Sequence, residues 1–457
     1  MLTYQDLQKI GQSDSERLTF VLNVINTHKD SDAYKMADVA DQYDHKKNVT
    51  ICEYQKLLYT IEGVAVPDNY SANFKIKSNF FNRFITQQNQ YLLGNGVTWE
   101  KKDTENKLGD DFDTKLQDAG HNALVHGVCF GFWNLDHVEI FDFLHFAPLY
   151  DEEDGALKAG VRFWRLDPLK PLRATLYELD GYTDYIWDGD GARILNQKRP
   201  YIFKVHVSSA DGVAIYDMIN YPSFPIVPLW GNKAHQSELE GIRESIDAYD
   251  LIKSGFANDL DDASMIYWTI NNAGGMDDID LVQFVQHMKR IKAAVVDDDG
   301  AHAESHSIEV PYASREALLD RIRSDLYDDF MALDTKAISN GAVTATQIKA
   351  AYEPLNNKTD MYEYCVLKFI DGIMALAGID DEPTFTRSQI VNSQEEIELI
   401  LSSSDYLSDD YITTKILTLL GDADKSEDVK KQRLTENAER YTEETEGDRQ
   451  GTGEDGA

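Results

Sequence analysis

The sequence is poor in basic residues for its size. Its 457 residues include 44 Lys and Arg but 80 Asp and Glu, which gives a formal net charge of −36. Proteins that wrap nucleic acid neutralise its phosphates with clustered Lys and Arg, so this composition argues against that class. Two interpretations of the charge stay open: solubility alone, or a surface that nucleic acid must pass without adhering.

Cysteine is also scarce. Cys52, Cys129 and Cys365 are far apart and odd in number, which argues against a disulfide framework and for a reducing compartment. The sequence has no apolar run of about 18 residues, so we expect no membrane-spanning segment and no membrane partner. The polar start is not typical of a signal peptide.

Catalytic motifs are missing as well. The sequence contains no GxxxxGK[ST], HExxH, GxSxG or CxxC motif, so we assign no catalytic residues, no cofactor-binding residues and no metal ligands, and we expect no enzyme activity and no cofactor. One alternative is a metal-dependent nuclease or hydrolase that uses the acidic runs 151–154, 261–262 and 297–299. His302 and His306 fall in an expected hairpin loop, where we interpret them as exposed rather than as metal ligands.

The chain is long enough for at least two structural units, and its apolar spacing predicts a mostly helical α+β protein. From residue 127 to about 216, short Val-, Ile- and aromatic-rich runs alternate with Asp-Gly turns, which predicts an antiparallel β-rich part. The segment 222–230, PSFPIVPLW, is interrupted by prolines and is expected to be an irregular connection from the β-rich part to the next helix. Strands are expected at 265–270, 293–296 and 307–310. Helices are expected within 1–60 and at 69–95, 110–125, 237–262, 280–291 and 314–333, with two more after a short strand in the C-terminal part.

Two local features of these helices stand out. Ser237 with Glu240 three residues on is the pattern of a capping box. The stretch SNGAVTATQIKAAYEPLNNK (339–358) begins a long helix that contains Pro354, although proline in a helix interior removes one hydrogen bond and clashes with the preceding turn. We expect a kink at Pro354, followed by an outer arm that packs through Val366, Phe369 and Ile373 and ends at Gly378. The alternative is a turn that separates two helices.

A basic spot and an acidic tail complete the picture. His287, Lys289, Arg290 and Lys292 lie together in an otherwise acidic chain; they form either a solvated helix face or a contact surface for DNA or an acidic partner. The last residues, 442–457, are acidic and Gly-containing, which is typical of disorder.

The order of these parts resembles a known family, the portal proteins of tailed bacteriophages, of the type found in long-tailed phages of Gram-positive hosts. The resemblance covers roughly residues 40–435. The most specific stretch is 224–259. In it a Pro, an Asn, Ser-x-Leu-Glu, Ile-Asp-Ala-Tyr-Asp and Asn-Asp follow one another in the order found in that family. Four stretches carry the resemblance: NFKIKSNFFNRFITQQNQYLLGNGVT (73–98), HFAPLYDEEDGALKAGVRFW (145–164), FPIVPLWGNKAHQSELEGIRESIDAYDLIKSGFAND (224–259) and ISNGAVTATQIKAAYEPLNNK (338–358).

The resemblance implies a subunit of a ring, typically of twelve copies, that is assembled in the host cytoplasm and occupies one vertex of the virion capsid. Double-stranded DNA would pass through the ring's tunnel during packaging and ejection. The implied partners are the terminase large subunit, the head-completion adaptor, and the major capsid and scaffolding proteins. The remaining alternative is an acidic scaffold protein without a tunnel.

The resemblance also implies a division of the chain into parts. These are a wing at 1–236, stem helices at 237–263 and 314–333, a small α/β clip at 264–313 and a tunnel loop at 334–344. A long kinked helix at 345–378 and a helical crown at 379–441 follow. The residues implied to face DNA are Lys336, Ser339, Asn340, Gly341, Ala342 and Val343, and the implied partner surface of the clip is His287, Lys289, Arg290 and Lys292.

Overall fold

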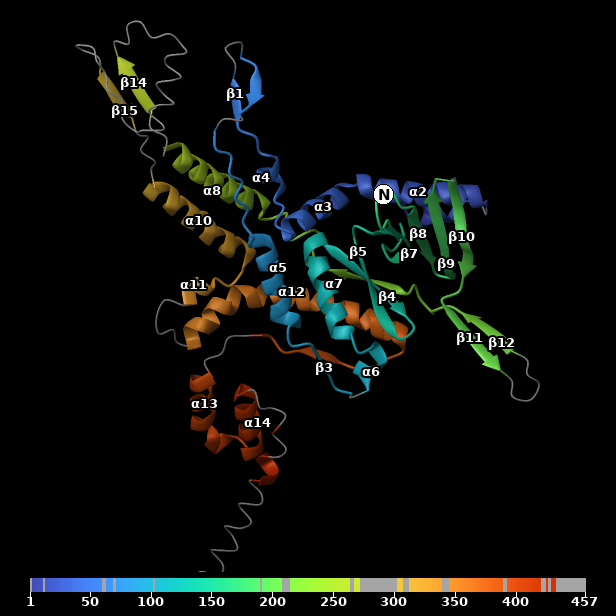
Figure 1. The fold of residues 1–457 in the computed structure, drawn as a ribbon. Helices are drawn as coiled ribbons and strands as arrows, with labels where there is room; N and C mark the ends of the chain where they lie inside the picture. The colour runs from blue at the N-terminus through green and yellow to red at the C-terminus, as the bar shows by residue number, and fades with distance from the viewer. Residues whose placement is uncertain are drawn as a thin grey trace, which may run out of the picture. The chain divides into compact units, whose positions relative to one another are not determined.

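The chain folds into two compact units in a computed structural model (Figure 1). The first unit contains residues 1–332 and 355–387, and the second contains residues 333–354 and 388–457. The structure describes residues 2–10, 13–59, 63–68, 71–101, 103–189, 191–207, 214–263, 267–271, 302–306, 312–338, 345–388, 393–420, 425 and 429–432.

Helices dominate both units, as predicted. In the first unit they are α1 (Tyr4–Gln8), α2 (Asp14–Asp30), α3 (Asp32–Asp44), α4 (Val49–Glu53), α5 (Phe80–Leu93), α6 (Thr104–Leu108), α7 (Phe112–His126), α8 (Arg243–Ala263) and α10 (Tyr312–Phe330). In the second unit they are α11 (Thr335–Ile338), α13 (Ser393–Ser402), the 3-10 turn η1 (Ser404–Tyr406) and α14 (Asp409–Leu420), while α12 (Ala345–Ala377) belongs to both.

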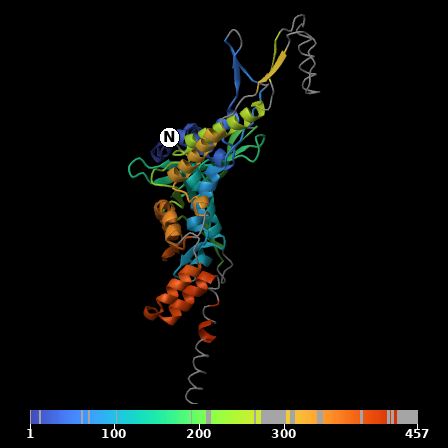
Figure 2. The ribbon, with the colours of Figure 1, turned by 90° about the vertical axis from the view of Figure 1, so that its left-hand side faces the viewer.

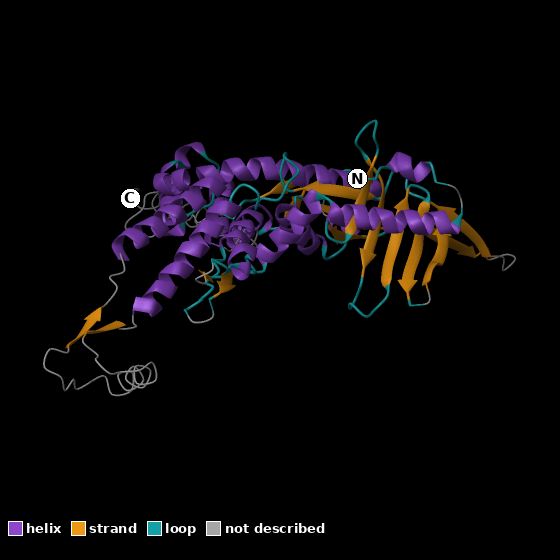
Figure 3. Cartoon of the chain, turned by 90° about the horizontal axis from the view of Figure 1, so that it is seen from above, coloured by secondary structure: helices purple, strands orange, loops and turns teal. Residues whose placement is uncertain are grey.

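The predicted antiparallel β-rich part is confirmed, and most of it forms one sheet of order β10-β9-β8-β7-β6. Its strands are β6 (Phe146–Tyr150), β7 (Leu157–Trp164), β8 (Leu172–Glu178), β9 (Gly181–Asp188) and β10 (Gly191–Arg199). The predicted Asp-Gly turns join β6 to β7, β8 to β9 and β9 to β10. Helix α2 lies across this sheet (Figures 1 and 3) and buries Val21, Val24 and Ile25 against Val161 and Leu176.

A second sheet, of order β13-β4-β5, forms the centre of the larger core. Its strands are β4 (Val128–Asn134), β5 (His137–Asp142) and β13 (Ile226–Trp230). The expected irregular connection at 222–230 is therefore wrong in part, because β13 pairs antiparallel with β4 and places Pro228 opposite Phe130. Pro228 is tolerated because β13 is an edge strand, where a missing N–H costs no ladder hydrogen bond.

Short hairpins extend from the first unit. They pair β1 (Leu57–Tyr59) with β2 (Ala65–Pro67), β11 (Ile202–Val207) with β12 (Ala214–Ile219), and β14 (Tyr267–Asn271) with β15 (His302–His306), while β16 (Pro383–Phe385) pairs with β3 (Val97–Trp99). His302 and His306 thus lie in a strand, opposite Asn271 and Tyr267, so the expectation of a loop is wrong. The strands expected at 293–296 and 307–310 and the helix expected at 280–291 lie outside the described residues.

The helix expected at 69–95 begins later than predicted. Residues 72–79 belong to no helix or strand, and α5 begins at Phe80. We call 72–79 the extended segment, because every second N–H from Phe74 to Ser78 bonds to the same helix. Its apolar face is buried as expected, through Phe81, Phe84, Ile85 and Leu92.

Helices α8 and α10 lie side by side (Figures 1 and 3). The Arg315 guanidinium of α10 is 2.5 Å from the Asp259 carboxylate of α8, and the rings of Phe256 and Tyr312 meet edge-on with centroids 5.9 Å apart. The β14–β15 hairpin follows α8 and precedes α10 in the chain.

The predicted start of α8 is wrong. The Ser237 hydroxyl accepts from the Leu239 N–H at 3.1 Å, so it closes a local turn rather than a capping box with Glu240. Residues 238–242 continue as turns, and the helix begins at Arg243.

In the second unit, α13 and α14 pack side by side (Figures 1 and 2), and both were expected from their apolar spacing. Many large apolar side chains of α13, α14 and the turn η1 between them stay exposed: Leu399, Leu401, Tyr406, Tyr411 and Leu420. Among the helices that the structure describes, none has the length and apolar character needed to cross a bilayer.

Candidate functional site

The candidate site residues from the sequence fall only partly on described residues. Lys336 is exposed on the short helix α11, where its N–H donates to the Asp334 carboxylate at 3.1 Å. This helix occupies part of the segment expected to be a loop at 334–344. Ser339, Asn340, Gly341, Ala342 and Val343, together with His287, Lys289, Arg290 and Lys292 of the basic spot, lie outside the described residues.

Pro354 lies inside α12, which runs as one helix from Ala345 to Ala377. The structure therefore excludes the alternative to a kink, which was two helices separated by a turn at Pro354. Since proline has no N–H, the carbonyl of Ala350 lacks its usual partner at this position. The boundary between the two compact units within α12 falls between Pro354 and Leu355, so the weakest point of the helix coincides with the place where it changes unit.

Beyond Pro354, α12 is anchored in the first unit by an apolar stripe. Val366, Phe369 and Ile373, the face expected to pack, are each at most 1% exposed. The fit is tight, because a Cβ added at Gly131 would lie 2.4 Å from the Phe369 ring. The helix ends at Gly378 with a φ of +69°, as its glycine predicts.

Polar contacts fix the same arm close to Pro354. The Tyr91 hydroxyl donates to the Asn356 side chain at 2.6 Å, and the Arg387 guanidinium donates to the same oxygen at 3.1 Å. Lys358 forms an ion pair of 2.7 Å with Glu238 and lies 3.2 Å from the centre of the Phe330 ring. Burial lowers the pKa of Lys358. Residues from four distant parts of the sequence thus meet at the first turn of the outer arm.

Helix α8 is held in a different way, which sequence patterns did not reveal. Three of its polar side chains accept hydrogen bonds from the backbone of the extended segment 72–79. Asp250 accepts from the Ser78 N–H at 2.9 Å, Ser254 from the Ile76 N–H at 2.9 Å, and Asn258 from the Phe74 N–H at 2.6 Å. The segment and the helix therefore run antiparallel, in a fixed register.

The register follows from two matching repeats. Two residues of extended chain advance about 6.6 Å, and four residues of helix advance about 6 Å, so every second N–H of the segment meets one turn of α8. Asp250 also accepts from the Asn48 amide and is fully buried, and burial raises the pKa of its carboxyl group. We call Asp250, Ser254 and Asn258 the polar stripe of α8. Its signal in the sequence is a polar residue every three or four positions of a long helix, which is also the pattern of a solvated face.

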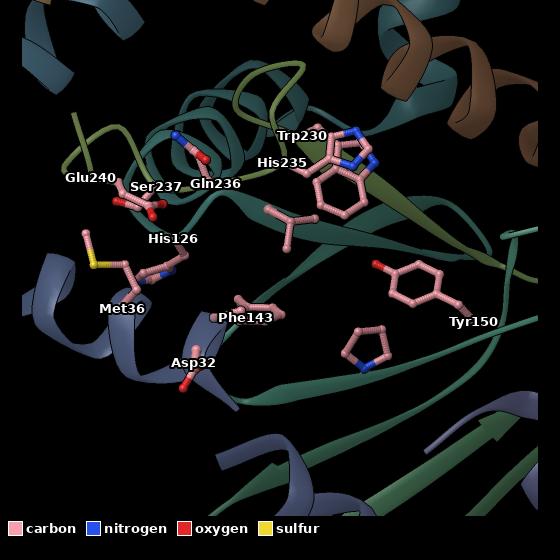
Figure 4. Close-up of a pocket in the computed structure, with 13 residues that line it drawn as sticks. Asp32, Met36, His126, Phe143, Tyr150, Trp230, His235, Gln236, Ser237 and Glu240 are labelled. Atoms are coloured by element: carbon pink, nitrogen blue, oxygen red, sulfur yellow. The ribbon is translucent and has the colours of Figure 1, made fainter. Parts of the chain in front are cut away.

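A cavity of about 280 Å³ lies between α3, the end of α7, β4, β6 and the turns that precede α8 (Figure 4). Figure 4 shows the carboxylates of Asp32 and Glu240 and the buried ring of His126 on one side of it. Neither ring nitrogen of His126 makes a hydrogen bond to the residues described around it, and the Ser237 hydroxyl is used by Leu239. Ser237 and His126 therefore do not form a hydrogen-bonded nucleophile–base pair.

The acidic runs give no metal centre in the described part of the chain, where no group of three or more His, Cys, Asp or Glu could hold an ion. In the run 151–154, Lys158 lies 2.6 Å from the Asp151 carboxylate and 2.9 Å from that of Asp154. The hydrogen bond from Lys158 holds the pKa of Asp151 well below its usual range. The run 297–299 lies outside the described residues.

Comparisons with known proteins give one family. A family model described as "Phage portal protein, SPP1 Gp6-like" matches residues 22–451. The portal protein of Clostridium phage phiCD119 is 27% identical over 192 residues, which are 40% of this chain and 43% of that protein. The portal protein of Bacillus phage SPP1 is 24% identical over 383 residues, which are 76% of this chain and 73% of that protein.

Solved structures with some likeness come from gene transfer agent particles. The neck of an empty particle, computed with C6 symmetry, covers 75% of this chain and 90% of its own at 11% identity and a TM-score of 0.43. The neck of a native particle, computed with C12 symmetry, covers 75% and 89% at 12% identity and a TM-score of 0.40. Scores this low support no conclusion about this chain.

Proposed function

The chain belongs to the SPP1 Gp6-like family of phage portal proteins, and we propose that it forms the ring through which the genome enters and leaves the capsid. The observation that carries the proposal is the family match, which extends over residues 22–451. The ring would occupy one vertex of the virion capsid and contain twelve copies, with double-stranded DNA as the molecule that it conducts.

The parts of the subunit follow from this proposal. The larger core, including residues 1–236 and the outer arm of α12, would be the wing. Helices α8 and α10 would be the stem, with the clip at 264–313 beyond them and the crown at 379–441. The ion pair between Asp259 and Arg315 supports a stem in which the two helices move as one body.

The net charge of the chain supports the proposal that the ring conducts DNA. Twelve copies would carry a formal charge of −432, twelve times −36. An acidic bore repels phosphates, so DNA is not retained by many weak ion pairs as it slides. The small, uncharged residues Ser339–Ala342, next to Lys336, would approach the duplex most closely.

Assembly into a ring accounts for the exposed apolar side chains of the second unit. Leu399, Tyr406 and Leu420 are 65%, 90% and 58% exposed, and large apolar residues exposed in this number are typical of surfaces that become buried between subunits. The proposed crown would bury them against neighbouring copies.

We propose no enzyme activity, since the sequence has no phosphate-binding loop and the family is one of portal proteins. The packaging ATPase would be a separate chain, the terminase large subunit, which would dock on the clip before the head-completion adaptor does. His287, Lys289, Arg290 and Lys292 are the proposed docking surface. The capsid and scaffolding proteins would contact the wing. A metal-dependent hydrolase would require DNA cleavage that depends on Asp297–Asp299.

Deletion of residues 337–342 tests the proposed DNA-facing loop. We expect rings to assemble as in the wild type while the amount of nuclease-protected DNA per particle falls sharply. A deletion of equal length at the C-terminal end, residues 452–457, is the matched control and should package normally. Full DNA content in particles that carry the loop deletion would contradict the assignment.

Pro354 is proposed as the hinge that sets the angle between the loop-bearing and outer arms of α12. Alanine would restore the hydrogen bond to Ala350 and remove the ring clash. We therefore expect Pro354→Ala to straighten α12 and to change the tunnel diameter in images of the ring. An unchanged diameter would show that Pro354 does not set the angle.

A further inference from the structure

Four basic side chains line one groove of the first unit, away from the cavity of Figure 4. The groove has a volume of about 510 Å³, and its lining residues come from the end of α3, the extended segment, the start of α5 and the middle of α8. Its cations are Lys46, Lys77, Arg83 and Lys253. We call these four residues and the space between them the basic groove.

The four cations form no ion pair with the residues that the structure describes, and Arg83 and Lys253 face the rings of Tyr327 and Tyr249. None of them has a carboxylate within 4 Å among the residues that the structure describes, although acids outnumber bases by 80 to 44. The nearby carboxylates are already in use. Asp44 accepts from His121 and Asn82 at 2.9 and 3.0 Å, and Asp250 accepts from Ser78 and Asn48.

The backbone and a buried hydroxyl add to the positive character of the groove. Asn79 precedes the first turn of α5, and its side chain does not cap the helix, since its amide donates to Asn82 instead. Uncapped N–H groups and the helix dipole favour an anion at this end. Ser78, in the wall of the groove, is 8% exposed, and its hydroxyl has no hydrogen-bond partner among the described residues.

Lys46 occupies a position that suits lysine poorly. Its φ is +57° at the end of α3, a left-handed conformation that glycine adopts without cost and other residues at about 1 kcal/mol. The end of a helix does not require lysine at this position, whereas a need for its positive charge would explain the residue.

We infer that the basic groove receives carboxylate side chains of the adjacent copy of this chain in the ring. The inference rests on the proposed function, which supplies the adjacent copy. A closed ring uses two different patches of each subunit, and these face each other between neighbours. Since each copy has 80 acidic residues, an opposing patch that carries carboxylates would neutralise the groove, whereas four cations without carboxylate partners on a DNA conduit would hold phosphates.

Charge reversal of the two exposed cations tests the inference. Lys46→Glu with Arg83→Glu should raise the concentration needed for ring formation about tenfold or more, because like charges would then face each other. Lys35→Glu with Lys107→Glu, which changes two exposed lysines elsewhere in the same unit, is the matched control and should assemble within about twofold of the wild type. Mass photometry over a dilution series measures both.

A second variant separates binding from folding. Lys46→Gly removes one charge and relieves the left-handed backbone, so the melting temperature of the subunit should stay the same or rise. The concentration for ring formation should still increase about two- to fivefold, the range of a single exposed ion pair. Added salt should weaken wild-type rings and affect the doubly reversed variant less.

Three results would overturn the inference. Rings of the doubly reversed variant that form as readily as the wild type would show that the groove is not a subunit contact. Wild-type rings that bind a labelled DNA duplex, with binding lost in the groove variants, would show that it serves nucleic acid instead. Wild-type protein that stays monomeric at every concentration would remove the proposed function and the inference together.

Discussion

Helices α8 and α12 are both long and both buried along one face, but the two faces differ in chemistry. The polar stripe of α8 binds the backbone of one extended segment through Asp250, Ser254 and Asn258. The outer arm of α12 is buried through Val366, Phe369 and Ile373. An apolar face contributes most of the stability but specifies position only by shape. A row of directed hydrogen bonds fixes register and direction.

The difference fits the parts that we propose for the two helices. A stem helix that carries force between clip and wing needs a fixed register, and the extended segment supplies it by joining α8 to α5. The outer arm of α12 needs firm burial beyond a hinge at Pro354. The predictions below test the comparison one face at a time.

The largest effect is expected on the apolar face. Phe369→Ala would leave a cavity against β4, because Phe369 is 1% exposed and touches Gly131. The free energy of unfolding should fall by about 3–5 kcal/mol. Met361→Ala, on the same helix and 47% exposed, should change it by less than about 0.5 kcal/mol. Urea unfolding followed by circular dichroism measures both, and equal losses would contradict the assigned burial.

A smaller loss is expected on the polar face. Asp250→Ala would leave the buried donors of Ser78 and Asn48 without an acceptor, which should cost about 2 kcal/mol. Hydrogen exchange at Phe74, Ile76 and Ser78 should accelerate together, since one register holds all three. Asp259→Ala, which breaks only the partly exposed pair with Arg315, is the control and should leave these amides protected. Unchanged exchange in Asp250→Ala would show that the stripe does not hold the segment.

One polar contact within the apolar face allows a finer test. The Tyr362 hydroxyl donates to Asn89 at 2.9 Å, so Tyr362→Phe should lower the free energy of unfolding by about 1 kcal/mol. Tyr364→Phe, at a position 51% exposed on the same helix, should have no measurable effect. A neutral Tyr362→Phe would mean that Asn89 finds another donor.

The smallest effect is a pH dependence with an unusual sign. Burial raises the pKa of Asp250 above its usual value of 3.8, so the folded state keeps this proton to a higher pH than the unfolded state does. The contribution of Asp250 to stability therefore falls as pH rises from about 3.8 through the raised pKa. Compared with Asp250→Asn, the wild type should lose relative stability as pH rises above about 4 in urea titrations. A difference that grows with pH would contradict the assignment.

The sequence predicts the apolar helices well because their signal is local. The spacing of Val366, Phe369 and Ile373 and the glycine after α12 were sufficient to predict the outer arm, and the mixed, mostly helical fold is confirmed. The antiparallel β-rich part was predicted equally well, because its Asp-Gly turns mark the ends of the strands.

Where the prediction failed, distant contacts decide the structure. Residues 72–79 have a helical apolar pattern but are extended, because their N–H groups bind side chains more than 170 positions away. Pro228 reads as a break, yet an edge strand accommodates it. Ser237 and Glu240 satisfy a capping pattern, but the Ser237 hydroxyl is taken by Leu239.

The basic groove shows the same limit for a candidate site. Its four cations come from a helix end, an extended segment and two helices, so no local run of charge marks it. The sequence instead drew attention to the contiguous basic spot at 287–292. Of the DNA-facing and docking residues assigned from the resemblance, all but Lys336 lie outside the described residues, and the roles of all of them stay predictions.

Imaging of the purified full-length chain by electron microscopy tests the central claim most directly. The account predicts closed rings with a central hole, in which α8 and α10 of each subunit lie between the clip and the wing. Compact monomers without rings, even at high protein concentration, would contradict it.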